Sequence, residues 1–246
     1  MNYEIKNLLS NSYYLKGCIS GMSGIILSHP IDTIKTNWQT TNLQLFKYNF
    51  SNLYRGITSP LIGVGIEKAI VFGTYNYCRN MNYNIVTSGA TSGLMASIIV
   101  SPYERIKILH QTNQLIDIKK CIKPSFIFKG LSTTFTREIP GFAIYFSTYE
   151  KLKEYFYTKN KNNITIPASF IFGGISGTMA WIFIYPQDRI KTIIQSSDMN
   201  IMNTINMIYK NGGIRHFYSG FSFAVARAIL LHSGTFSMME ILNRIR

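Results

Sequence analysis

Apolar segments long enough to cross a membrane alternate with shorter polar stretches along the chain. Six such segments fall into three pairs. The first member of each pair ends beside a proline and a run of charged residues, and the second begins after a triplet that ends in glycine. A helix needs about 20 residues to cross the hydrocarbon core of a bilayer, and the second members cover roughly 60–80, 131–156 and 221–244. The pattern predicts six membrane-length helices.

The polar stretch at each of the three prolines repeats one spacing: an acid two residues after the proline, a base three residues later and a glutamine four residues after that. One copy alone is explained by an ordinary helix end, because an interior proline removes a backbone hydrogen bond and kinks the helix. Three copies at near-regular intervals indicate an internally triplicated chain, which we divide into repeats at approximately 10–82, 83–160 and 161–246 of a single domain. The motif residues are Pro30, Asp32, Lys35 and Gln39; Pro102, Glu104, Lys107 and Gln111; and Pro186, Asp188, Lys191 and Gln195.

Two further features recur in every repeat. Glycines four residues apart share one helical stripe before each proline, where they allow close approach between membrane helices; they are Gly17 and Gly21, Gly89 and Gly93, and Gly173 and Gly177. After each motif, an aromatic-x-glycine triplet ends at Gly56, Gly130 and Gly220. Each repeat is therefore expected to contain a kinked helix, a polar connection and a second helix.

The polar connection of the third repeat is the longest and alone has room for a full amphipathic helix. Ile201, Ile205 and Ile208 would form its apolar stripe, and a glycine pair would end it. We expect this helix to lie along a membrane surface.

The proline-acid-base motif and the aromatic-x-glycine triplet, each present three times, resemble the mitochondrial carrier family over essentially the whole chain. The resemblance implies an all-α membrane protein, with six transmembrane helices forming three pseudo-threefold helix pairs around a central cavity. It implies a multi-pass monomer of the mitochondrial inner membrane that exchanges small solutes by alternating access, without enzymatic activity, cofactor or metal. It also makes cardiolipin or another acidic lipid the ligand of the triplet glycines, for which a plain helix cap is the alternative.

In this family the acid of one repeat pairs with the base of the next and closes the matrix end. The resemblance implies pairs of Asp32 with Lys107, Glu104 with Lys191 and Asp188 with Lys35. The glutamines of the motifs would brace these pairs from one turn away.

The family's motif for the opposite, cytoplasmic end reads aromatic-acid-x-x-base and is incomplete in this sequence. The second repeat has it in full, with Tyr149, Glu150 and Lys153, whereas asparagine stands for the acid at position 76 and for the base at position 243. The resemblance then leaves only Glu240 and Arg79 to pair across repeats. We expect a gate that opens easily and an unliganded protein that rests open to the cytoplasm.

Charged residues also occur halfway along the second helices, where they are costly and by default indicate a site. They are Glu67, Lys68, Arg137, Glu138 and Arg227. Carboxylates of this set can hold ammonium groups, and Arg227 can make a bidentate contact with a carboxylate. We expect Arg137 to neutralise Glu138 when the cavity is empty.

An arginine followed by an acid on the fourth helix is similar to carriers of amino acids, carnitine and S-adenosylmethionine, and the residues around Lys68 and Arg227 resemble the ornithine and carnitine carriers most. This favours a cationic or zwitterionic amino-acid-like substrate. The alternative is a nucleotide or deoxynucleotide exchanger of the same family, in which Lys68, Arg137 and Arg227 receive phosphates.

The formal net charge of +14 points to an anionic partner. Because many charges lie beside long apolar runs, acidic lipid head groups fit better than nucleic acid. Cys18, Cys78 and Cys121 are too far apart in the sequence for a zinc motif or a disulfide framework, and no cleaved targeting segment is evident. A non-transporting scaffold or proton leak would have a lost motif or an emptied central site, and the sequence has neither. No catalytic triad or phosphate-binding loop supports an enzyme.

Overall fold

The described part of the chain is helical throughout. The computed structural model describes the backbone of residues 12–40, 53–54, 56–111, 131–157, 164–197 and 201–244, while the side chains of 34–40, 59, 102–111, 133 and 191–197 lie outside this description. Seven helices occupy these ranges: α2 (Tyr13–Thr40), α4 (Thr58–Asn80), α5 (Ile85–Gln111), α8 (Leu131–Tyr157), α9 (Ile166–Ser197), α10 (Ile201–His216) and α11 (Phe221–Arg244). The bounds of α4, α8 and α11 confirm the second helices that the sequence predicts.

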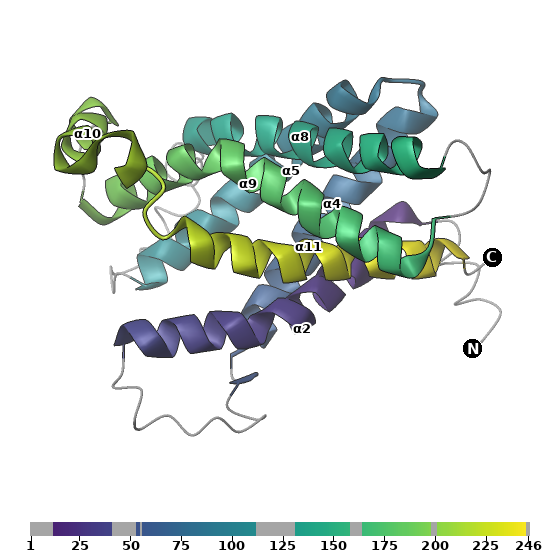
Figure 1. Cartoon of the computed structure of the whole chain (residues 1–246), viewed down its shortest axis with the longest axis horizontal. Helices are drawn as coiled ribbons and strands as arrows, with labels where there is room; N and C mark the ends of the chain where they lie inside the picture. The colour runs from purple at the N-terminus through teal and green to yellow at the C-terminus, as the bar shows by residue number, and fades with distance from the viewer. Residues whose placement is uncertain are drawn as a thin grey trace, which may run out of the picture.

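The long helices lie together in one bundle (Figure 1), and their contacts follow the order of the chain and close into a ring. α2 contacts α4, α4 contacts α5, α5 contacts α8, α8 contacts α9, α9 contacts α11, and α11 returns to α2. The start of α2 and the end of α11 lie at the same end of the bundle, where Lys16 Nζ donates a hydrogen bond to Asn243 Oδ1 at 3.1 Å. A ring of this kind encloses a central space, which the site described below occupies.

The predicted glycine pairs lie where the two helices of a repeat approach most closely. A Cβ at Gly21 would come within 2.7 Å of the Lys68 side chain, and one at Gly89 within 2.8 Å of the Phe142 carbonyl. In the third repeat, a Cβ at Gly177 would collide with the ring of His232. Real Cβ atoms do not make such contacts, so the glycines allow each first helix to pack directly on the central stretch of its partner.

The prolines of the motif lie inside the first helices, which continue beyond them. Pro30 lies inside α2 and Pro186 inside α9, and Pro102 falls within the span of α5. Glycine at the predicted stop also ends regular helix in α10, because Gly212 and Gly213 have non-helical backbone angles. Before this break Ile208 is fully buried whereas Ile201 is 54% exposed, so only part of the predicted apolar stripe packs inward.

Aromatic rings fill one end of the ring of helices. This aromatic layer consists of Phe72, Tyr75, Phe142, Tyr145, Phe146, Tyr149 and Phe236, all of which are buried. Tyr75 stacks on Phe146 with ring centroids 3.8 Å apart, and Tyr149 stacks on Phe236 at 3.6 Å. These contacts join α4 to α8 and α8 to α11, so one continuous layer links the second helices of all three repeats.

Hydropathy alone identifies a single candidate span among the described residues. Only the Ile166–Ile190 part of α9 is both long enough and apolar enough to cross a membrane by this measure. Two other long helices, α4 and α8, carry charged residues in their central turns, which lowers their mean hydropathy. That all six long helices cross a membrane therefore stays a proposal.

Candidate functional site

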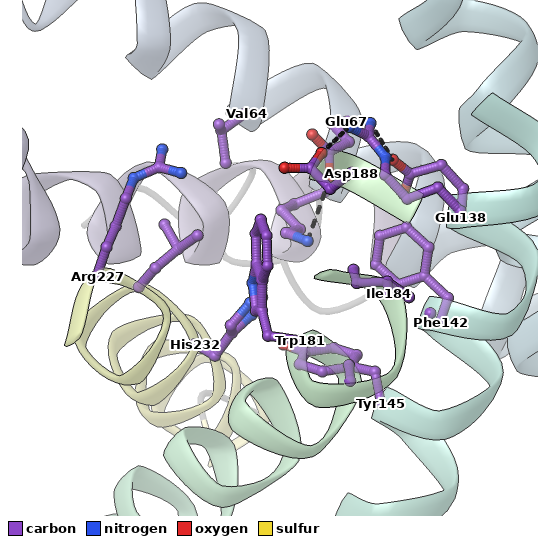
Figure 2. A pocket seen from close by; sticks show the side chains of 15 residues that line it. Val64, Glu67, Glu138, Phe142, Tyr145, Trp181, Ile184, Asp188, Arg227 and His232 are labelled. Atoms are coloured by element: carbon purple, nitrogen blue, oxygen red, sulfur yellow. Dashed lines mark hydrogen bonds and ion pairs between the residues drawn. The ribbon is translucent and has the colours of Figure 1, made fainter. Parts of the chain in front are cut away.

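A cavity of about 350 Å³ lies inside the ring of helices (Figure 2). Its wall contains all five charged residues that the sequence places at the centre of the second helices. They come from three elements: Glu67 and Lys68 from α4, Arg137 and Glu138 from α8, and Arg227 from α11. Residues more than 150 positions apart in the sequence thus share one cavity, as the triplicated pattern predicts.

Arg137 bridges two carboxylates across the cavity wall. Its guanidinium contacts the Glu138 carboxylate beside it and reaches Asp188 Oδ1 on α9 at 3.1 Å. Figure 2 labels the two acids, Glu138 and Asp188, on the cavity wall. The structure places Arg137 against Glu138, and neutralisation of Glu138 stays a prediction. The contact with Asp188 adds a link between the second and third repeats.

Two further ion pairs surround the same cavity. Arg227 Nε lies 2.8 Å from the Asp32 carboxylate of α2, and Lys68 Nζ lies 3.2 Å from Glu67 Oε1. The Lys68 ammonium also lies over the Phe142 ring, 4.6 Å from its centroid. At this distance the ring face attracts the ammonium group in a cation–π interaction. Every base that lines the cavity therefore already contacts a carboxylate of the protein.

Acidic and basic side chains nearly balance around the cavity. Three lining side chains are acidic and three are basic: Glu67, Glu138 and Asp188 against Lys68, Arg137 and Arg227. Asp32 pairs with Arg227 from outside this lining and adds a fourth acid. Such a site does not favour a ligand of high net negative charge, because burying an uncompensated charge is expensive. The arrangement suits a ligand that carries both a positive and a negative charge. It also suits a ligand whose charged group can replace one member of an existing ion pair.

Apolar and aromatic side chains complete the wall, and the sequence argument did not single them out. Trp181 and Ile184 of α9 project toward the cavity, opposite Phe142 and Tyr145 of α8, with His232 beside them (Figure 2). Trp181 could have been recognised from the sequence because it breaks the threefold repeat. The residue five positions before the proline is tryptophan in the third repeat, but isoleucine in the first and serine in the second. His232 and Phe142 lie seven residues before Met239 and Tyr149, the same offset as Lys68 before Tyr75, so they share one inward stripe.

Two acids of the predicted matrix gate have a partner that the sequence did not indicate. Asp32 contacts Arg227 and Asp188 contacts Arg137, so both reach the central arginines. The remaining gate side chains lie outside the described residues, and the inter-repeat pairs stay a prediction; they are Lys35, Gln39, Glu104, Lys107, Gln111, Lys191 and Gln195.

The end of the bundle that carries the cytoplasmic motif differs from expectation. The Glu240 carboxylate contacts Arg244 one turn on, at 3.3 Å, and Arg79 Nη1 donates to the Tyr83 carbonyl. The expected pair of Glu240 with Arg79 is therefore not formed. Glu150 and Lys153 make no ion pair with any other described residue. The buried aromatic layer instead packs this end shut, in contrast to the open end that counting ion pairs led us to expect.

The triplet glycines adopt a backbone conformation that requires glycine. Gly56 has φ 81° just before α4, and Gly220 has φ 83° just before α11. Side-chain-bearing residues rarely adopt this left-handed region, so the turn before each helix accounts for these two glycines without any ligand. Lipid binding there stays a prediction, and Gly130 lies outside the described residues.

Known proteins of similar sequence are mitochondrial transporters. A mitochondrial basic amino acids transporter of Bos taurus is 25% identical over 267 residues, which cover 93% of this chain and 90% of that protein. A mitochondrial glycine transporter of Saccharomyces cerevisiae is 29% identical over 276 residues, with 94% and 90% covered. Mitochondrial ornithine transporter 1 of the same yeast is 27% identical over 275 residues, with 93% and 94% covered.

The family is shown by a match that occurs three times along the chain. The sequence matches the family described as mitochondrial carrier protein at residues 8–86, 82–160 and 162–246. These three matches together leave only a few residues uncovered. The chain therefore belongs to the mitochondrial carrier family.

Proposed function

We propose that this carrier is a multi-pass antiporter of the mitochondrial inner membrane that exchanges a cationic or zwitterionic amino-acid-like metabolite by alternating access. The observation that carries the proposal is the cavity in which each lysine and arginine is already paired with an acid. Similarity to carriers named for basic amino acids, glycine and ornithine supports the same substrate class.

The outer face of the ring supports insertion into a membrane. Large apolar side chains on several helices remain exposed around the bundle, among them Ile66 (50%), Ile171 (58%) and Phe183 (57%). Extended apolar surface of this kind indicates contact with lipid or a partner. The low hydropathy of the helices then follows from their inward, charged faces, which line a wet cavity.

The ion pairs suggest how a zwitterion binds. Its carboxylate takes the place of Asp32 on Arg227 in a bidentate contact, and its ammonium group binds a carboxylate of the wall, such as Glu67 or Glu138. One internal pair is exchanged for two pairs with the ligand, and the net charge of the cavity does not change because a zwitterion has none. A nucleotide with several phosphate charges instead brings net negative charge next to these carboxylates, which makes the nucleotide alternative the weaker one.

The same exchange links binding to gating in this proposal. Asp32 and Asp188 belong to the proline motifs, and a ligand that occupies Arg227 or Arg137 releases them toward their predicted partners, Lys107 and Lys35. Formation of the predicted matrix network then favours opening of the aromatic layer at the other end. Ligand binding thus shifts the equilibrium between two conformations, as alternating access requires.

Lipid and oligomeric state complete the proposal. We place an acidic lipid such as cardiolipin at the turns of Gly56 and Gly220, where backbone N–H groups of a helix start can bind an anion. The transport unit is a monomer, because the helices of one chain close the ring around the cavity.

Transport by purified protein in cardiolipin-containing liposomes tests the proposal. We expect exchange of labelled ornithine or arginine, tested beside glycine, carnitine, S-adenosylmethionine, ADP and dATP. Arg227→Ala and Glu138→Gln should each abolish exchange and keep the thermal unfolding midpoint. Lys210→Ala, which removes an exposed charge from α10, serves as the control.

Two results would contradict the proposal. Uptake retained in both cavity variants would exclude this site. Exchange of ADP or dATP alone would replace the amino-acid substrate by the nucleotide class.

A further inference from the structure

Each proline in a first helix leaves one backbone carbonyl without its helical donor. In an α-helix the N–H of a residue bonds the carbonyl four positions earlier, and proline has no N–H. The carbonyls concerned are those of Ile26, four residues before Pro30, and Ile182, four residues before Pro186. A carbonyl that loses its helical partner needs another donor or water.

Tyrosine hydroxyls supply that donor in two repeats. Tyr54 Oη donates to the Ile26 carbonyl at 3.1 Å, and Tyr218 Oη donates to the Ile182 carbonyl at 3.1 Å. These tyrosines are the aromatic members of the triplets that end at Gly56 and Gly220. Two independent copies of the same bond, at the same offset from proline, indicate a built feature.

A second hydrogen bond joins the same turn to each kink. In the first repeat Thr33 Oγ1, three residues after Pro30, donates to the Leu53 carbonyl at 2.7 Å. In the third repeat Tyr185 Oη, just before Pro186, donates to the Ser219 carbonyl at 2.7 Å. The turn before each second helix is thus tied to the kinked part of the first helix by two bonds.

Ring contacts reinforce the tie in both repeats. The residue before the proline packs against the tyrosine of the triplet, with ring centroids 6.1 Å apart for His29 with Tyr54 and 6.1 Å for Tyr185 with Tyr218. In the second repeat the triplet begins with Phe128, which has no hydroxyl and lies outside the described residues.

We infer that Tyr54 and Tyr218 are positioning residues that cap the carbonyls exposed by Pro30 and Pro186 and make the two helices of their repeat move as one unit. The inference rests on the proposed transport function. Neither tyrosine lines the cavity, so their effect reaches the solute only through the helices. Alternating access by rigid-body movement needs such ties, because a bend that yields locally does not transmit its motion to the neighbouring helix.

Removal of single hydroxyls tests the inference. The variants are Tyr54→Phe and Tyr218→Phe, which keep the rings. Tyr209→Phe on the exposed side of α10 is the matched control. The measurements are amide hydrogen exchange in peptides spanning Pro30 and Pro186, and exchange kinetics in liposomes.

We expect amide exchange at the corresponding kink to rise by about five-fold, the factor that one net hydrogen bond contributes. Turnover should fall by a similar factor at unchanged KM, because the cavity residues are untouched. The Tyr209→Phe control should resemble the wild type in both measurements.

Two results would overturn the inference. Amide exchange indistinguishable from that of Tyr209→Phe would show that the hydroxyls do not hold the kinks. Faster amide exchange with normal turnover would make the tyrosines structural only. A wild-type protein that transports none of the solutes would refute the proposed function instead, while the amide-exchange result would still report on the bonds.

Discussion

The two ends of the central cavity are held by different forces. Toward the motif of Tyr75 and Tyr149, stacked rings from three helices close the bundle, with centroid distances of 3.6 to 3.8 Å in the tightest pairs. Toward the prolines, the contacts are charged, and the pairs of Asp32 with Arg227 and Asp188 with Arg137 join different repeats. Apolar contact is non-directional and is not weakened by ionic screening, whereas ion pairs can exchange partners with a charged solute. In the transport cycle proposed above, the aromatic end is closed by packing and the charged end responds to the solute.

The largest effect should come from cutting the aromatic layer. Phe236→Ala removes contacts with Tyr149, Tyr145 and Phe72, and a buried Phe-to-Ala change costs about 3–5 kcal/mol. We expect a lower thermal unfolding midpoint and faster reaction of the buried native Cys78 with thiol reagents, measured in a background where Cys18 and Cys121 are serine. Phe183→Ala, on an exposed face, is the control. Equal stability of the two variants would mean that the layer does not hold this end.

Neutralising one acid of the charged end should affect affinity and turnover in opposite directions. In Asp32→Asn the Arg227 guanidinium loses an anionic partner, so the substrate carboxylate meets less competition. A charge-assisted hydrogen bond contributes about 1.5–3 kcal/mol, from which we expect about ten-fold tighter binding and a comparable fall in turnover. Equilibrium binding and liposome exchange measure the two, with Lys210→Ala as the control. Weaker binding would contradict competition between Asp32 and the solute.

Salt should affect the two ends differently while the ion pairs and the aromatic layer keep all their side chains. At 1 M salt the Debye length is about 3 Å, so the partly exposed pairs at the charged end weaken while stacked rings do not. We expect labelling of a cysteine introduced at Val64, in the cavity wall, to accelerate by about two-fold. Labelling of Cys78 in the same background should stay constant. Acceleration at both positions would argue that ion pairs hold the aromatic end too.

The smallest effect should come from the acid that the sequence places in the cytoplasmic gate. Glu240→Gln breaks only the pair with Arg244, whose side chain is 43% exposed, and such pairs along a helix contribute about 0.3–0.5 kcal/mol. Thermal unfolding and exchange should therefore stay close to wild type. A large loss of transport would restore Glu240 to the role that the sequence pattern suggested.

The sequence was most informative where three copies of a residue pattern had to agree. The prolines, glycine pairs and triplets predicted the helices, and the charged residues in the central turns predicted the cavity wall. Contacts between different repeats could not be predicted in this way. Asp32 and Arg227 lie 195 residues apart, and nothing in their spacing indicates that they pair. Only folding of the ring brings them together.

The aromatic layer could have been predicted from the sequence. Phe72, Phe146 and Phe236 each lie three residues before Tyr75, Tyr149 and Met239, a threefold pattern as regular as the proline motif. We expected that end to open easily because two of its charged residues are replaced by asparagine. Burial of large rings, however, contributes more stability than a partly exposed ion pair. The hydrogen bonds of Tyr54 and Tyr218 could not be predicted for another reason. Each hydroxyl donates to a backbone carbonyl, which every residue has, so no particular residue type in the sequence marks the acceptor.

The internal pairing of the cavity has a consequence for inorganic ions. A potassium or chloride ion that enters finds every wall charge already countered by a neighbour, and a single spherical charge cannot take over both halves of a pair. It gains little by shedding its hydration shell there. A cavity of this kind gives inorganic ions little binding energy, whereas a molecule that carries opposite charges at a fixed separation can take over both halves of a pair.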